Sequence, residues 1–153
     1  ANIGNPNNEI FDLNQTLQLV IQLHAIEDNL HIKWRPVQQR IMVNADKTHV
    51  NRLFNNLLQN AIQSVPKFRL ANIEVEEALK GDSILVIIKD NGAGIPEDMR
   101  SRIFTPNFTT KTSGTGLGLA MCKSIVEQCK GNIWFETQEG VGTTFFVELP
   151  IVK

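Results

Sequence analysis

Apolar residues recur at helical spacing in three stretches of the chain. In the clearest stretch, residues 50–65, they follow the i, i+3, i+4, i+7 rule, and Asp46 and Pro66 stand where an N-cap and a stop are expected. An earlier helix is predicted to continue to about residue 29, and a later one to cover residues 117–130. The pattern therefore predicts three helices.

Shorter runs of apolar or alternating residues predict strands between these helices. Residues 80–82 and 139–142 are typical hairpin turns, and Gly131 stands where a left-handed helix cap is expected. The mixed order of about three helices and five or more strands predicts a two-layer α/β sandwich, with the helices on one face of a mixed sheet of about five strands. The predicted strands are residues 11–13, 30–35, 40–43, 73–79, 83–89, 133–137 and 143–149.

Length and composition suit a single packed domain, because the 153 residues are 42% hydrophobic. The formal net charge of −1 gives no electrostatic footprint for nucleic acid or an anionic membrane. Because no apolar run could span a membrane and no signal peptide is recognisable, we expect a cytoplasmic, monomeric domain. Residues 1–8 are interpreted as a linker remnant from a longer protein, and residues 9–153 as the domain. Cys122 and Cys129 fit no zinc or disulfide pattern and are expected to be buried and reduced.

Three amide side chains form a polar stripe along the flank of the central predicted helix. Asn56, Asn60 and Gln63 have i, i+4, i+7 spacing. An amide oxygen is a suitable neutral ligand for a Mg²⁺ ion that triphosphate oxygens already hold. We therefore predict Asn60 as the metal ligand. Taken alone, the stripe is equally compatible with solvated side chains.

Asp90 ends an apolar strand and is followed by Gly92 and Gly94. This arrangement places a carboxylate where the backbone can approach a flat ring closely. A carboxylate accepts a hydrogen bond from the exocyclic amine of adenine and repels the oxygen of guanine, so Asp90 is predicted to read an adenine base. Without other motifs, the same residues fit an ordinary turn at least as well.

A second glycine cluster, Gly114, Gly116 and Gly118, directly precedes a predicted helix. Unpaired amides and the positive end of the helix can approach a phosphate there. The spacing matches neither a dinucleotide-binding fingerprint nor a P-loop, so both of those nucleotide folds are disfavoured.

The stretch between the glycine clusters, residues 96–113, is longer than most loops and is predicted to be a lid over the phosphates. Lys111 is predicted to reach the terminal phosphate, whereas Arg100 and Arg102 are expected to be solvated or ion-paired. Phe104 and Phe108 are possible anchors of this lid.

From about residue 9 to residue 150, these motifs resemble, in their order, the catalytic and ATP-binding domain of bacterial sensor histidine kinases. Residues 56–61 are similar to the N box of that family, residues 90–95 to its first glycine box, residues 103–111 to its F box and residues 114–119 to its second glycine box. The form of the F box, Phe-x-Pro-x-Phe-Thr-Thr-Lys, looks most like the nitrogen-regulation subgroup.

The resemblance implies the Bergerat α/β sandwich shared with gyrase, Hsp90-like chaperones and mismatch-repair ATPases, with ATP and Mg²⁺ bound. It implies that Asn60 ligates Mg²⁺, that Asp90 binds adenine, and that Asn56 and Lys111 act on the phosphates. The further residues expected in the nucleotide site are Gly92, Gly94, Ile95, Gly114, Thr115, Gly116, Leu117, Gly118 and Leu119, with Thr143 or Thr144 near adenine.

Some positions depart from the family pattern. Gln63 stands where many relatives have Lys, Asn107 replaces a common aromatic residue, and residues 130–132 replace His-Gly-Gly. In the related ATPases a Glu base typically stands four residues before the metal-binding Asn, where this chain has Asn56. Because an amide cannot take a proton, efficient hydrolysis or serine phosphorylation is disfavoured. A neutral imidazole needs less help, because it already carries a nucleophilic lone pair.

The phosphoacceptor is expected outside this chain, because none of its histidines, His24, His31 and His49, is followed by an acidic residue. The resemblance places it on a dimerisation domain of the same protein, with a response regulator downstream. Two alternatives remain open: a nucleotide-gated interaction module without transfer, and an ATPase or serine kinase that would need another base.

Overall fold

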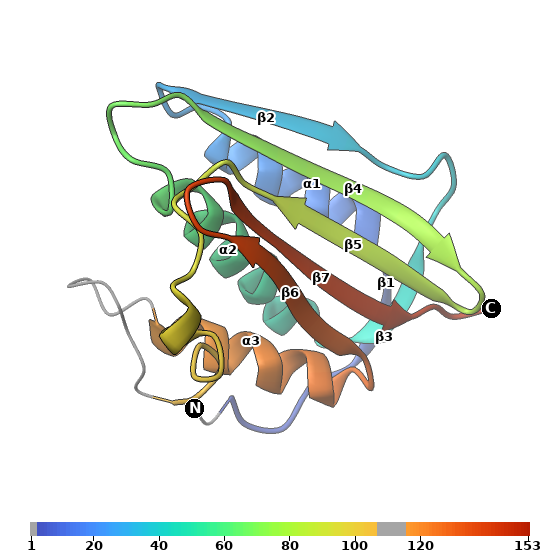
Figure 1. The fold of residues 1–153 in the computed structure, drawn as a ribbon. Helices are drawn as coiled ribbons and strands as arrows, with labels where there is room; N and C mark the ends of the chain where they lie inside the picture. Colours follow the sequence, from blue (N-terminus) through green and yellow to red (C-terminus); the bar gives the residue numbers. More distant parts are fainter. Residues whose placement is uncertain (1–2, 107–115) are drawn as a thin grey trace.

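Five strands form the main sheet of the computed structural model, which describes residues 3–106 and 116–153 (Figure 1). Two of these strands, β2 and β4, run parallel, and all other neighbours run antiparallel. A separate antiparallel pair, β1 and β3, lies beside the helices. In spatial order the main sheet contains β2 (Leu30–Arg35), β4 (Ala71–Lys80), β5 (Ser83–Lys89), β7 (Gly142–Pro150) and β6 (Asn132–Gln138), and the pair contains β1 (Glu9–Asp12) and β3 (Met42–Ala45).

Three α-helices cover one face of the sheet, as Figure 1 shows. They are α1 (Leu13–His24), α2 (Lys47–Gln63) and α3 (Gly116–Gln128), and a short 3₁₀ helix, η1 (Glu97–Met99), lies between β5 and α3 in sequence. The predicted two-layer α/β sandwich is therefore confirmed. Within the described ranges, none of these helices is long and apolar enough to cross a membrane.

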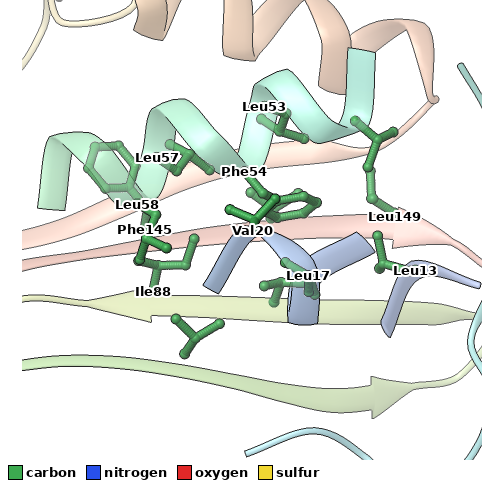
Figure 2. Packing of buried hydrophobic residues seen from close by; sticks show 14 of the residues in the cluster. Leu13, Leu17, Val20, Leu53, Phe54, Leu57, Leu58, Ile88, Phe145 and Leu149 are labelled. Carbon is green, nitrogen blue, oxygen red and sulfur yellow. The ribbon is translucent and has the colours of Figure 1, made fainter. Parts of the chain in front are cut away.

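Helix α2 lies at the centre of the core, because its apolar stripe meets α1 and the strands (Figure 2). Phe54 and Leu57 are at most 1% exposed, and burial of each such side chain contributes about 1.5 to 3 kcal/mol. The predicted N-cap is confirmed, since Asp46 Oδ1 accepts hydrogen bonds from the amides of Thr48 and His49 at 3.0 and 3.2 Å.

Several element ends differ from the prediction. Strand β1 covers Glu9–Asp12 rather than residues 11–13, because Leu13 already begins α1. Helix α1 ends at His24, and the chain then turns until Asn29, whose left-handed φ of 61° leads into β2. Strand β3 begins at Met42 rather than at residue 40. The reason is that the Ile41 amide donates to the side chain of Asp12, at 3.3 Å, instead of to a strand partner.

The predicted left-handed cap of α3 is wrong by one residue. Lys130, not Gly131, has a positive φ, of 62°. The amides of Lys130 and Gly131 donate to the carbonyls of Glu127 and Val126, each at 3.0 Å, which is the paired hydrogen bonding of a Schellman cap. Gly131 is needed for a different reason: a Cβ there would lie 2.1 Å from the carbonyl oxygen of Glu148 in β7.

His24 and the two cysteines contribute to the packing of the fold. His24 is a boundary residue whose Nε2 lies 2.7 Å from Asn55 Oδ1. Cys122 is fully buried, and burial raises the pKa of its thiol to about 12. Cys129 is also unpaired but only half-buried, so its expected full burial is wrong.

Residues 3–8, which we expected to be part of a linker, lie against the domain. Ile3 packs on the core, and the side chain of Gln128 donates to the carbonyl of Gly4 at 3.0 Å. The amide of Asn7 donates to Asp46 Oδ2 at 2.8 Å, and this hydrogen bond is the largest contribution lowering the pKa of the Asp46 carboxyl. This segment therefore stabilises the capping carboxylate of α2.

A buried carboxylate lies in β4. Glu77 in β4 is 8% exposed, and its Oε1 accepts from the amide of Val37 at 3.1 Å. Among the described residues no group donates to its Oε2. Burial raises the pKa of Glu77 from its ordinary 4.5 to about 7; the Val37 hydrogen bond opposes this shift and the Asp12 carboxylate adds to it.

The stability of the domain is therefore predicted to fall as pH rises from 4.5 to 7. In that window the folded chain keeps the Glu77 proton that the unfolded chain has released. The variant Glu77→Gln keeps the acceptor for Val37 without ionising. Chemical denaturation at pH 8 should give a free energy of unfolding about 1 to 3 kcal/mol higher than that of the wild type.

The exposed Glu139→Gln serves as the matched control for this change and should keep the wild-type slope of stability against pH. An unchanged slope between pH 4.5 and 7 in Glu77→Gln would contradict the assignment.

Candidate nucleotide-binding site

Asp90 directly follows β5 and has a side chain that is only 5% exposed. Its Oδ1 accepts hydrogen bonds from the amides of Gly92 and Thr143, at 2.8 and 3.1 Å. Its own amide donates to the carbonyl of Thr143 at 2.9 Å. Backbone donors therefore fix the orientation of a buried carboxylate at the position predicted to accept from the adenine amine.

Two glycines allow backbone segments to pass close to this carboxylate. Gly142 has a φ of +149°, and a Cβ there would lie 2.1 Å from the carbonyl oxygen of Asp90. Gly94 has a φ of +78°, and a Cβ there would lie 2.5 Å from the carbonyl oxygen of Gln138. Close contact between chain segments therefore requires glycine at both positions. The close approach of a flat ring, which the sequence suggested, is a separate reason.

The C-terminal turn of α2 is tied to the same loop. The amide of Ala93 donates to the carbonyl of Ser64 at 3.1 Å, and the carbonyl of Ala93 accepts from the amide of Gly140 at 2.8 Å. The loop after Asp90 is thus held between α2 and the β6–β7 turn.

Thr137, which sequence reasoning missed, joins two predicted site residues. Its hydroxyl oxygen accepts from the amide of Ile95 at 2.9 Å and lies 2.9 Å from the hydroxyl oxygen of Thr143. Thr137 and Thr143 are directly paired across the β6–β7 hairpin. Pairing the two predicted strands around residues 139–142 could have revealed this contact.

The two candidate threonines of β7 lie on opposite faces of the sheet, because side chains alternate along a strand. Thr143 is 4% exposed and lies beside Asp90. Thr144 is half-buried on the face away from the helices. The structure therefore brings Thr143, and not Thr144, into contact with Asp90.

The polar flank of α2 connects this loop with the start of α3. The side-chain NH₂ of Asn56 donates to the carbonyl of Arg52 at 2.9 Å, and its Oδ1 lies 3.0 Å from where a Cβ on Gly118 would be. Asn60 is half-buried between Asn56 and Ser64. Two helical turns, about 12 Å, therefore separate the contact with α3 from the contact with the Asp90 loop.

The side chains of the candidate site suit a metal ion that is already bound to the phosphates of a nucleotide. Within the described ranges, no group of three or more His, Cys, Asp or Glu side chains could hold a metal ion. Asn60 offers one amide oxygen on the flank of α2. A Mg²⁺ ion that keeps waters and binds phosphate oxygens needs few protein ligands, so Asn60 fits such an ion.

An aromatic cluster anchors the first part of the predicted lid. The ring of Phe104 lies edge-on to Phe135 and Phe145, with centroid distances of 6.0 and 6.3 Å, and Ile103 is 3% exposed. The Nζ of Lys123 in α3 lies 5.7 Å from the centroid of Phe104. Phe104 is thus confirmed as an anchor.

Arg100 differs from its expected role as a solvated or ion-paired residue. It is half-buried, and its Nε donates to the carbonyl of Ile95 at 3.0 Å. A long side chain can reach back five residues in a turn, which sequence spacing alone does not reveal. Arg100 therefore holds the base of the lid.

The structure describes only the later part of the second glycine cluster, from Gly116 onward. Gly116 begins α3, and Leu117 follows it in the helix backbone. Gly118 and Leu119 are half-buried in the first turns of the helix. The predicted site residues Lys111, Gly114 and Thr115, with Asn107 and Phe108, lie outside the described residues.

The chain belongs to the family of histidine kinase-, DNA gyrase B- and HSP90-like ATPases, whose family model matches residues 45–153. The catalytic domain of histidine kinase ThkA has a similar structure, with a TM-score of 0.83 and 32% identity over 94% of this chain and 95% of that one. A complex of ThkA with response regulator protein TrrA contains a similar structure, with a TM-score of 0.80 and 28% identity over 96% of this chain and 42% of the ThkA chain.

Curated relatives are sensor kinases as well. The sensor histidine kinase ZraS of Escherichia coli strain K12 is 37% identical over 139 residues, which cover 91% of this chain and 29% of ZraS. The sensor protein kinase WalK of Staphylococcus epidermidis strain ATCC 12228 is 34% identical over 150 residues, which cover 93% of this chain and 24% of WalK. The chain therefore spans less than a third of the length of these relatives, and its resemblance to histidine kinase catalytic domains is confirmed.

The variant Asp90→Asn tests the adenine assignment. It keeps an Oδ1 acceptor for the amides of Gly92 and Thr143, so the fold should survive, but it replaces the other carboxylate oxygen with an NH₂ donor. Calorimetry should show that affinity for ATP and ADP falls by about 10- to 100-fold.

The matched control is Asp82→Asn at the exposed β4–β5 turn, which should leave both affinities unchanged. Wild-type affinity in a folded Asp90→Asn variant would show that the adenine assignment is wrong.

Proposed function

We propose that this chain binds ATP with Mg²⁺ and transfers the γ-phosphoryl group to a histidine on a dimerisation domain of the same protein. In this proposal the adenine end of the nucleotide lies at Asp90 and Thr143, and the phosphate end at Asn56, Asn60 and the start of α3. The family membership and the buried, amide-held carboxylate of Asp90 support nucleotide binding.

Asn56 is the observation on which the proposed reaction depends. Its side-chain NH₂ already donates to the carbonyl of Arg52, and its Oδ1 faces the first turns of α3. An amide at this position can orient a phosphate but cannot remove a proton from water or a serine hydroxyl. A neutral imidazole carries its own lone pair, so histidine is the nucleophile that suits this site.

Phosphoryl transfer depends mainly on positioning and charge neutralisation. The amide oxygen of Asn60 would hold Mg²⁺ together with phosphate oxygens, and Lys111 and the amides around Gly116 would contact the phosphates. The ion would supply charge neutralisation when bound. Asn60 and Asn56 lie one helical turn apart, which suits adjacent contacts along one triphosphate.

The partners follow from the same reaction. The ThkA complex with TrrA supports a response regulator as the protein that next receives the phosphoryl group. We further propose that the domain is cytoplasmic and monomeric in isolation, and that it belongs to the nitrogen-regulation subgroup, as its F box suggests.

The variant Asn60→Ala separates the two ends of the site. It should lower Mg²⁺-dependent transfer of label from ATP to a separately supplied dimerisation domain by about 10- to 100-fold. Affinity for ADP measured without Mg²⁺ should remain at the wild-type value, because Asp90 is intact. Chelation of Mg²⁺ should reproduce the loss in the wild-type chain.

Gln59→Ala changes the exposed neighbouring residue on α2 and should transfer label normally. Undiminished transfer by Asn60→Ala would contradict the metal assignment. Wild-type binding of ATP with no transfer to any dimerisation domain would favour a nucleotide-gated interaction module, and dominant release of free phosphate would favour an ATPase.

A further inference from the structure

The loop that carries the adenine acceptor is attached at both ends to one pair of threonines. At its start, Asp90 exchanges hydrogen bonds with the backbone of Thr143, at 2.9 and 3.1 Å. At its end, the amide of Ile95 donates to the hydroxyl of Thr137 at 2.9 Å. Because Thr137 and Thr143 face each other across β6 and β7, the loop closes on a single cross-strand pair.

The proton of the Thr137 hydroxyl has two acceptors within reach. The hydroxyl oxygen of Thr143 lies at 2.9 Å and the carbonyl oxygen of Gly142 at 3.3 Å. Either hydroxyl of the threonine pair could be the donor. Because hydroxyl donors prefer acceptors at about 2.5–3.0 Å, we infer that Thr137 donates its proton to Thr143. Since Thr137 also accepts from Ile95, its hydroxyl then donates one hydrogen bond and accepts another within the protein.

This arrangement decides what Thr143 can offer to a ligand. A threonine hydroxyl has one proton, and Thr143 receives a hydrogen bond from Thr137 instead of donating one to it. Thr143 therefore keeps its own proton for an acceptor beside Asp90, such as a ring nitrogen of the base. Asp90 accepts and Thr143 donates, which together match an amine next to a ring nitrogen.

The same hydroxyl fixes the base of the lid. Ile95 donates its amide to Thr137, and its carbonyl accepts from the Nε of Arg100 at 3.0 Å. Both backbone polar groups of Ile95, the residue directly before the lid, are thereby held in place. The first turn of the lid is thus connected to the base-binding threonine through one hydroxyl.

We propose that Thr137 is a positioning residue for nucleotide binding, which sets the donor direction of the Thr143 hydroxyl and fixes the lid at Ile95. The inference rests on the proposed function, since it assigns adenine to Asp90 and Thr143. Thr137 acts through these residues and touches no reacting atom.

The test compares Thr137→Val, which removes the hydroxyl at nearly constant shape, with Thr137→Ser, which retains it. Calorimetry should show about tenfold weaker binding of both ATP and ADP to Thr137→Val, with wild-type affinities for Thr137→Ser. Amide hydrogen exchange should show loss of protection at Ile95 in Thr137→Val alone. The exposed Thr48→Val on α2 is the matched control and should bind as the wild type does.

The outcomes separate this inference from the proposed function. Equal affinities of Thr137→Val and Thr137→Ser would overturn it, and so would weaker binding of ATP with unchanged binding of ADP, which would place the effect at the phosphate end. Absence of phosphoryl transfer by the wild-type chain would overturn the proposed reaction but not this comparison, which measures binding alone. If Thr137→Val does not fold, Thr137→Ala takes its place in the comparison with Thr137→Ser. Protection of the Ile95 amide should then be lost in Thr137→Ala and kept in Thr137→Ser, and equal protection in both would overturn the inference.

Discussion

The hydrogen bonds from the amides of Gly92 and Thr143 to the buried carboxylate of Asp90 are the constraint on which the site depends. A carboxylate that is 5% exposed is costly to bury unless donors compensate its charge. These donors come from β7 and from the turn after β5, so the sheet must form before the acceptor is in position. The candidate base-binding end of the site is therefore in position only once the sheet has folded.

The helices form the opposite end of the site. Helix α2 reaches from Ser64, which binds the loop after Asp90, to Asn56, which lies against Gly118 in α3. Asn60 lies between them, so in the proposed site one rigid helix would set the spacing of base, metal and phosphate. Because the apolar stripe of α2 is buried, the helix cannot rotate without opening the core. Substitutions on its exposed face should therefore leave this spacing unchanged.

Local periodicity was sufficient to predict the elements whose stability comes from one buried face. Helix α2, its cap at Asp46 and the amides at Asn56 and Asn60 follow from spacing along a single segment. The place of Asp90 at a strand end before two glycines was also read from one segment, whereas its role at adenine stays a prediction. These predictions required no knowledge of which segments meet in space.

The residues that were missed or misassigned act between segments. Thr137 has meaning only once β6 is paired with β7, and Arg100 only once its turn brings it back to Ile95. Gly131 was assigned to a left-handed cap, whereas Lys130 takes that conformation and Gly131 makes room for a carbonyl of β7. In each case the cause is a contact that sequence distance does not encode.

The most direct test of a preformed base-binding site is amide hydrogen exchange at Gly92 and Thr143 in the nucleotide-free chain. We predict that both amides are protected before any nucleotide is added, because Asp90 already accepts from them, and that ADP increases the protection further. Exchange of both amides at unprotected rates, while the β5–β7 ladder stays protected, would contradict the account.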